Sequence, residues 1–160
     1  MRMGWKKTAL GALLGLTAMV GGCGGSYPIV ATQPARQTAI RDVRIVRGPG
    51  VPDDRWSYFV DHRLDQDLVA ALRGSFPRAE GPELVVTVTH FTAPRAVGHA
   101  WLDARVDQVG PSGPVAEPFI VRAEAHGEAD FWGSGELGRR DDAARRVCAD
   151  VVRQVTSTLR

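Results

Sequence analysis

The sequence has almost no lysine, only two cysteines, and no apolar run long enough to cross a membrane. Its only lysines are Lys6 and Lys7, and the arginines do not gather into a basic run of the kind that follows a phosphate backbone. This absence argues against nucleic acid as a partner. The chain of 160 residues is instead a mixture of short alternating and periodic segments behind one apolar segment near its start.

The apolar segment covers residues 8–22 and follows three positive charges, at Arg2, Lys6 and Lys7. As a helix rising about 1.5 Å per residue it spans about 22 Å. The hydrocarbon core of a bilayer is about 30 Å thick, so the segment is too short for a permanent membrane helix. The positive start and the small residues at the end are typical of a cleaved export leader.

The leader ends in Val20-Gly21-Gly22-Cys23, which resembles the lipobox of bacterial lipoproteins: an aliphatic residue, two small residues and a cysteine. Leucine is commoner than valine at the first position. The resemblance implies that the Cys23 thiol receives a diacylglyceryl group, that the leader is cleaved before Cys23, and that the new amino group is acylated, for example with palmitate. Two or three acyl chains anchor a protein durably, because each buried methylene contributes about 0.8 kcal/mol. The alternative is a plain secretory leader with a chance cysteine.

Removal of the leader changes the charge and the cysteine inventory. Seventeen of the 20 basic residues and all 18 acidic residues remain, which gives a net charge of −1 over 138 residues. That length suits one domain. With Cys23 bonded to lipid, Cys148 has no partner for a disulfide. Cys148 falls on the apolar stripe of a predicted helix, so we expect a buried, inert thiol rather than a nucleophile or an intermolecular bridge.

We predict three segments: a lipoprotein signal peptide at 1–22, a lipidated N-terminus and flexible tether at 23–38, and an α+β periplasmic domain at 39–160. The tether is rich in Gly, Pro, Gln, Ala and Ser. Gly24 stands where aspartate would favour retention in the inner membrane, so the lipobox resemblance implies the outer membrane.

Strands are predicted at 39–47, 84–91, 100–107 and 121–130, and helices at 61–76 and 141–159, with Asp61 capping the first helix. Residues 51–58 are expected to form a loop in which Trp56 and Tyr58 pack down on the domain. In the third strand Ala100 and Leu102 alternate with Trp101 and Asp103, so one sheet face is dry and the other wet.

The order βαβββα gives a two-layer α+β fold, with a four-stranded, mainly antiparallel sheet and two helices on one face. This layout is similar to small α/β-roll accessory lipoproteins of the outer membrane, including the lipopolysaccharide-assembly lipoprotein. The resemblance implies a scaffolding or partner-binding role.

Two patterns suggest chemistry. Residues 133–138, GSGELG, match the dinucleotide pattern GxGxxG. No parallel strand or acidic residue follows at the distance such a fold needs, so a flexible glycine turn is expected. His90 and His99 flank a turn and are expected to be cross-strand neighbours. These two histidines and a carboxylate could form a zinc site, or they could be polar residues at the edge of the sheet without a metal. We prefer the second interpretation. No catalytic residue, cofactor or metal is assigned.

A surface for a partner is the preferred functional candidate. Four apolar residues are predicted on the outward parity of the sheet among charges: Trp101, Val85, Phe91 and Ile120. Apolar anchors inside a polar rim are how interfaces concentrate their binding energy. We therefore predict a non-catalytic, membrane-anchored accessory domain that contacts the membrane through acyl chains on Cys23 and binds an envelope protein. A carrier of lipid or another apolar ligand is the second hypothesis, and a hydrolytic enzyme is the third.

Overall fold

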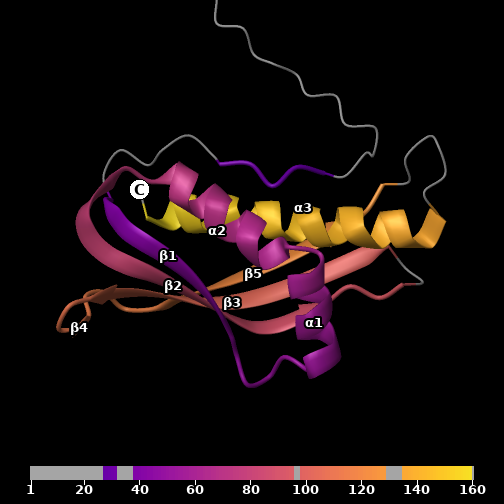
Figure 1. Ribbon diagram of the computed structural model, residues 1–160, viewed down its shortest axis with the longest axis horizontal. Coiled ribbons are helices and arrows are strands. Elements are labelled where there is room, and N and C mark those ends of the chain that lie inside the picture. Colours follow the sequence, from indigo (N-terminus) through magenta and orange to yellow (C-terminus); the bar gives the residue numbers. More distant parts are fainter. Residues whose placement is uncertain (1–26, 32–37, 96–97, 129–134, 160) are drawn as a thin grey trace, which may run out of the picture.

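The computed structural model describes residues 27–31, 38–95, 98–128 and 135–159. The predicted leader and Cys23 therefore lie outside the described residues. The elements along the chain are β1 (Ile40–Arg47), α1 (Asp53–Asp61), α2 (Leu64–Ser75), β2 (Arg78–Thr92), β3 (His99–Gly110), β4 (Gly113–Pro114), β5 (Phe119–His126) and α3 (Gly135–Thr158) (Figure 1).

The sheet has β2 and β3 at its centre. Strand β1 pairs with β2 in parallel, whereas β3 pairs antiparallel with β2, with β5 and with the two-residue strand β4. Helices α2 and α3 lie over the same face of the sheet, as Figure 1 shows. The predicted two-layer α+β class with a mainly antiparallel sheet is confirmed. The structure adds α1 and the short strand β4 to the predicted order.

The core fills the space between the sheet and the two long helices. The alternation predicted for β3 is present, because Ala100, Leu102, Ala104 and Val106 are all fully buried. Helix α3 presents its valine stripe to these small side chains, which let a helix approach closely. The fully buried residues that face one another here are Leu64, Leu68, Leu72, Leu84, Val86, Val88, Ala100, Leu102, Ala104, Val106, Val147, Cys148, Val151, Val152 and Val155.

Residues 53–61 form helix α1, so the loop predicted over 51–58 is wrong. Asp53 and Asp54 occupy the first turn, where negative charge is favourable. Phe59 is fully buried and lies 4.9 Å from the ring of Phe91, edge to face. Arg63, in the left-handed conformation with φ 59°, then separates α1 from α2. Asp61 consequently ends α1 and does not cap α2.

A β-bulge in β2 reverses the side on which Phe91 lies. The register with β3 shifts between Val88 and His90, so that Val88 and Phe91 both face the core although they are an odd number of positions, three, apart in the sequence. An extra residue in one strand has this effect because side chains alternate with a period of two. The prediction of Phe91 as part of an outward surface is therefore wrong, since it is 1 % exposed.

Residues 27–31 lie along the outer side of the helix layer, although they belong to the segment predicted as a tether (Figure 1). Ile29 packs against the core. The guanidinium of Arg146 on α3 lies 4.5 Å from the ring centroid of Tyr27. Ala31 lies so close to Gly74 on α2 that a Cβ at Gly74 would be 2.8 Å from the Cβ of Ala31. This short segment thus contacts both long helices.

The aromatic contact between α1 and the sheet gives a test of the fold. We expect Phe59→Ala in the full chain to lower the free energy of unfolding by about 3–5 kcal/mol, because it leaves a cavity between Trp56 and Phe91. Ile120→Ala, at a residue that is 58 % exposed, is the control and should change it by less than about 0.5 kcal/mol. Urea denaturation followed by circular dichroism measures both. Equal effects would contradict this packing.

Candidate functional site

The outer face of the sheet, opposite α2 and α3, carries two of the four residues predicted as a partner surface. Ile120 on β5 is 58 % exposed and Trp101 on β3 is partly exposed. Val85 is only 9 % exposed, and Phe91 is in the core. Ile120 lies opposite Arg105 on β3, and Arg105 is four residues from Trp101 on the same strand. Ile120 and Trp101 are therefore separated by about 13 Å along the strand direction. They are two separate apolar points and not one patch.

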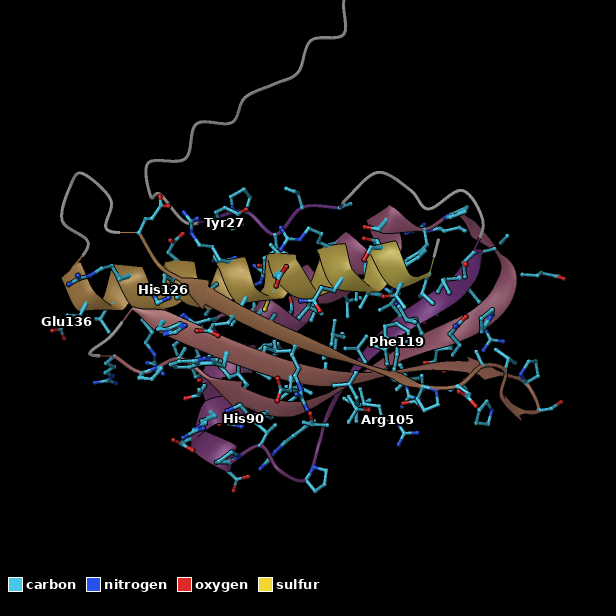
Figure 2. The ribbon with its side chains drawn as sticks, turned by 180° about the vertical axis from the view of Figure 1, so that it is seen from behind. Tyr27, His90, Arg105, Phe119, His126 and Glu136 are labelled. Carbon is cyan, nitrogen blue, oxygen red and sulfur yellow. The ribbon has the colours of Figure 1, made fainter. Side chains whose placement is uncertain are left out.

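Charged side chains surround these two points. Arg105 (labelled in Figure 2) donates hydrogen bonds to both carboxylate oxygens of Asp107, at 3.0 and 3.1 Å from its Nε. This carboxylate raises the pKa of Arg105. Arg44 on β1 donates to Glu83 on β2 at 2.8 Å. Exposed pairs of this kind contribute little to stability, and their effect is to keep the face soluble and polar.

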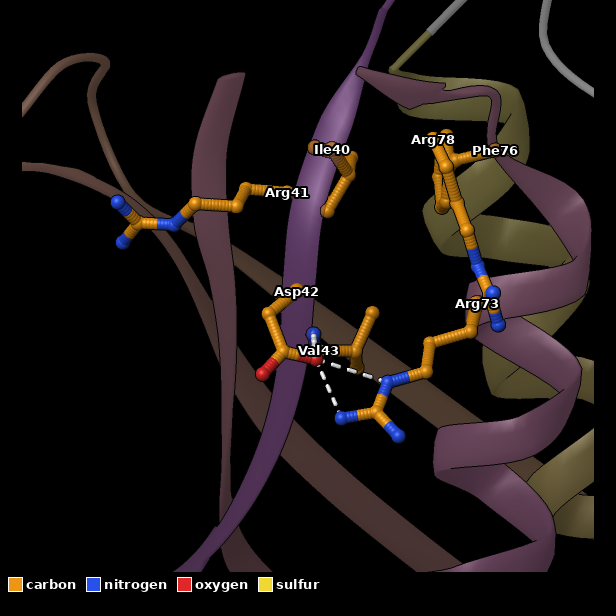
Figure 3. A pocket seen from close by; sticks show the side chains of 7 residues that line it. All are labelled: Ile40, Arg41, Asp42, Val43, Arg73, Phe76 and Arg78. Carbon is orange, nitrogen blue, oxygen red and sulfur yellow. Dashed lines mark hydrogen bonds and ion pairs between the residues drawn. The ribbon is translucent and has the colours of Figure 1, made fainter. Parts of the chain in front are cut away.

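A hollow of about 220 Å³ lies between β1 and the end of α2 (Figure 3). Arg73 reaches across it and donates from Nε to Oδ1 of Asp42 at 2.8 Å. The pKa of Asp42 is lowered, first by the hydrogen bond from the Val43 backbone N–H and then by Arg73. The remaining charges, on Arg41 and Arg78, belong to exposed residues. The hollow thus lies at the edge of the core, between charged side chains and the buried Ile40, Val43 and Phe76.

A polar cluster joins α1 to the start of α3. The hydroxyl of Tyr58 donates to Oδ1 of Asp141, and Nδ1 of His62 lies 3.4 Å from the same oxygen. The guanidinium of Arg140 lies 3.7 Å from the centroid of the Tyr58 ring. Burial, and next the hydrogen bond to Asp141, raise the pKa of Tyr58. The prediction that Tyr58 packs down on the domain is confirmed, whereas its bond to Asp141 has no local signal in the sequence.

The histidines pair differently from the expectation. His90 lies opposite Asp103, and His99 lies opposite His126, so the expected pairing of His90 with His99 is wrong. The bulge in β2 and the length of the turn that follows set this register. The rings of His99 and His126 stack with their centroids 3.8 Å apart. His90 and His126 are labelled in Figure 2.

The remaining candidates are buried or only partly described. Cys148 is fully buried and free, and burial raises the pKa of its thiol, as expected for an inert cysteine. Within the glycine motif, Gly135 opens α3 with φ 66°, and residues 133 and 134 lie outside the described residues. Among the helices that the structure describes, none combines the length and the apolarity that a membrane span requires.

Comparison with known proteins gives distant structural likenesses. No protein-family model and no curated protein matches the chain. It is similar to a minor lipoprotein from Acinetobacter baumannii, at 14% identity and TM-score 0.40 over 76% of this chain and 92% of that one. It is also similar to a presumed lipoprotein from Caulobacter crescentus CB15, at 18% identity and TM-score 0.40 over 73% and 86% of the two chains. Likenesses this distant leave the function to be argued from the chain's own residues.

The Tyr58 hydroxyl predicts how stability depends on pH. An unfolded tyrosine ionises near pH 10, and the raised pKa keeps Tyr58 protonated in the folded state above that pH. The folded state then holds more protons than the unfolded state, so the free energy of unfolding falls as pH rises above about 10. Tyr58→Phe should reduce this fall.

Tyr27→Phe is the matched control, because it leaves the Tyr58 hydroxyl in place. Chemical denaturation of each variant from pH 8 to 11 measures the slope. A slope that is the same in Tyr58→Phe and in the wild type would show that this hydroxyl does not carry the effect.

Proposed function

We propose that this protein is a lipoprotein of the bacterial outer membrane, anchored through acyl chains on Cys23, whose α+β domain faces the periplasm and acts by binding without catalysis. The observation that carries the proposal is the order of residues 2–23: positive charges, a short apolar segment, and Val20-Gly21-Gly22-Cys23. An ordinary secretory leader does not require a cysteine at this position. The lipid, once attached, holds the domain at a membrane surface.

The short link between Cys23 and the folded domain supports a close attachment. Residues 24–26 separate Cys23 from Tyr27, and an extended chain spans at most about 3.6 Å per residue, so Tyr27 lies within about 14 Å of the lipid-bearing residue. Tyr27 contacts Arg146 on α3, and Ile29 packs against the core. The anchor therefore joins the domain on the side of its helices, beside the end of β5, because Tyr27 lines one pocket with His126 and Arg146.

The packing of the interior favours surface binding over a carrier. A site for a lipid or an apolar ligand is a largely apolar cavity of about 300–1,000 Å³. Here the space between the helices and the sheet is filled by side chains that have no solvent-accessible surface, such as Leu68, Leu72 and Leu102. The hollow at Asp42 and Arg73 lies at the edge of this layer, and four of its seven lining residues are charged. A carrier would need the packed layer to open.

The polar cluster at Tyr58 supports a structural, non-catalytic role for the pair formed by His62 and Asp141. Asp141 accepts the Tyr58 hydroxyl hydrogen bond and lies near His62, so its oxygens join α1 to α3. The partner surface that we propose is the outer face of the sheet, where Ile120 and Trp101 are apolar points among ion pairs. An envelope protein with apolar side chains spaced by about 13 Å and a polar rim would fit this face.

The anchor is tested by replacing the one atom that carries the lipid. We expect Cys23→Ser, produced in a Gram-negative host, to move the protein from the membrane fraction to the soluble periplasmic fraction, because a serine hydroxyl is not lipidated. Cys148→Ala is the control, since that thiol is buried and away from the leader, and it should stay in the membrane fraction. Immunoblotting of both fractions measures the distribution. A Cys23→Ser protein that stays with the membrane would refute the anchor.

A further inference from the structure

We propose that His99, Glu124 and His126 form a binding site for a divalent transition-metal ion of the zinc type, on the outer face of the sheet. The site lies where β3 begins and β5 ends. It does not depend on the lipid anchor, and it is separate from the Tyr58 cluster. One ring nitrogen of each histidine and one carboxylate oxygen of Glu124 lie within 4.8 Å of one another.

The strand register brings the three side chains together. His99 on β3 is the direct cross-strand partner of His126 on β5, and Trp101 is the partner of Glu124. Successive side chains on a strand point to opposite faces, so Glu124 and His126, two residues apart, share one face. Their neighbours Ala123 and Ala100 face the core instead. The arrangement is therefore fixed by the backbone of two paired strands and not by a loop.

The donor set is chemically suited to zinc. Imidazole nitrogen and carboxylate oxygen bind Zn²⁺ at about 2.0–2.2 Å, and three protein ligands with one open position are typical of sites that also hold water. Tetrahedral ligands at that distance are about 3.4 Å apart. Nε2 of His99 and Oε1 of Glu124 are 2.7 Å apart, and the Glu124 side chain is 59% exposed. A small rotation of this exposed carboxylate would open the space for the ion.

His99 has a buried ring nitrogen without a hydrogen bond, and a metal ion could bind this nitrogen. Its Nε2 is buried and has no hydrogen-bond partner among the described residues, because the nearby Glu124 oxygen does not lie in a hydrogen-bonding direction. Buried polar atoms are nearly always paired in folded proteins. The His99 ring also packs against Trp101 and against His126, with ring centroids 3.8 Å away in each case. The packing against Trp101 holds the His99 ring in place, whereas the exposed His126 ring has to turn out of the stack to bind the same ion, because a ring nitrogen donates its lone pair in the plane of the ring.

The competing interpretation is a stacked histidine pair beside the Glu124 carboxylate, with no ion. Calorimetric titration of the full chain, without a histidine tag, separates the two. We expect Zn²⁺ to bind with one strong site per chain, while Mg²⁺ and Ca²⁺, which prefer oxygen-only ligand sets, give no comparable heat. Glu124→Gln and His126→Ala should each weaken Zn²⁺ binding by at least about tenfold.

The control is His90→Ala, which removes an exposed histidine from β2 outside the cluster and should bind Zn²⁺ as the wild type does. Glu124 and His126 are exposed, so their variants keep the fold, which circular dichroism checks. A second measurement is tryptophan fluorescence, since Zn²⁺ at His99 should change the emission of Trp101, and Trp101→Phe should lose that change while still binding the ion. Absence of a strong site in the wild type, or unchanged affinity in Glu124→Gln and His126→Ala, would overturn the proposal.

Discussion

The valine stripe of α3 packs on the small residues of β3 and β5, and this contact decides which face of the sheet is buried. Ala100 and Ala104 on β3 and Val147 and Val151 on α3 are all fully buried, and α3 packs against β3. Their short side chains allow close approach, and each buried apolar side chain contributes about 1.5–3 kcal/mol relative to exposure. This contact commits one face of the sheet to the helices. The opposite face of the sheet is thereby left for charges, for Trp101 and for the histidine pair.

The sequence predicts regular features well and register poorly. The two-residue alternation of β3 and the apolar stripe containing Val147, Cys148 and Val151 were both predicted. Each pattern repeats over many residues, so it indicates the buried face even if one residue departs from it. The bulge near Thr89 is one extra residue, yet it moves Phe91 from the outer face to the core. Helix α1 is short and depends on Phe59 meeting Phe91, a contact between distant residues.

The same limit explains the candidate sites. His99 pairs with His126, but their strands are separated in the sequence by β4 and two turns. No local sequence pattern therefore predicts this pairing. The bond between Tyr58 and Asp141 joins elements separated by most of the domain. By contrast, the lipobox is contiguous in sequence, so the proposed anchor at Cys23 is the feature that sequence alone defines best. Folding is what brings the remaining functional candidates together.

The proposed anchor at Cys23 and the proposed partner surface together imply an orientation in which the helix layer is nearer the membrane and the outer face of the sheet is available to a protein partner. A photo-crosslinking residue placed in cells at Arg153, which is exposed on α3 beside residues 27–30, and at Ile120 on β5 tests it most directly. We expect lipid adducts from position 153 and protein adducts without lipid from position 120. Lipid adducts from position 120 and none from position 153 would contradict this orientation.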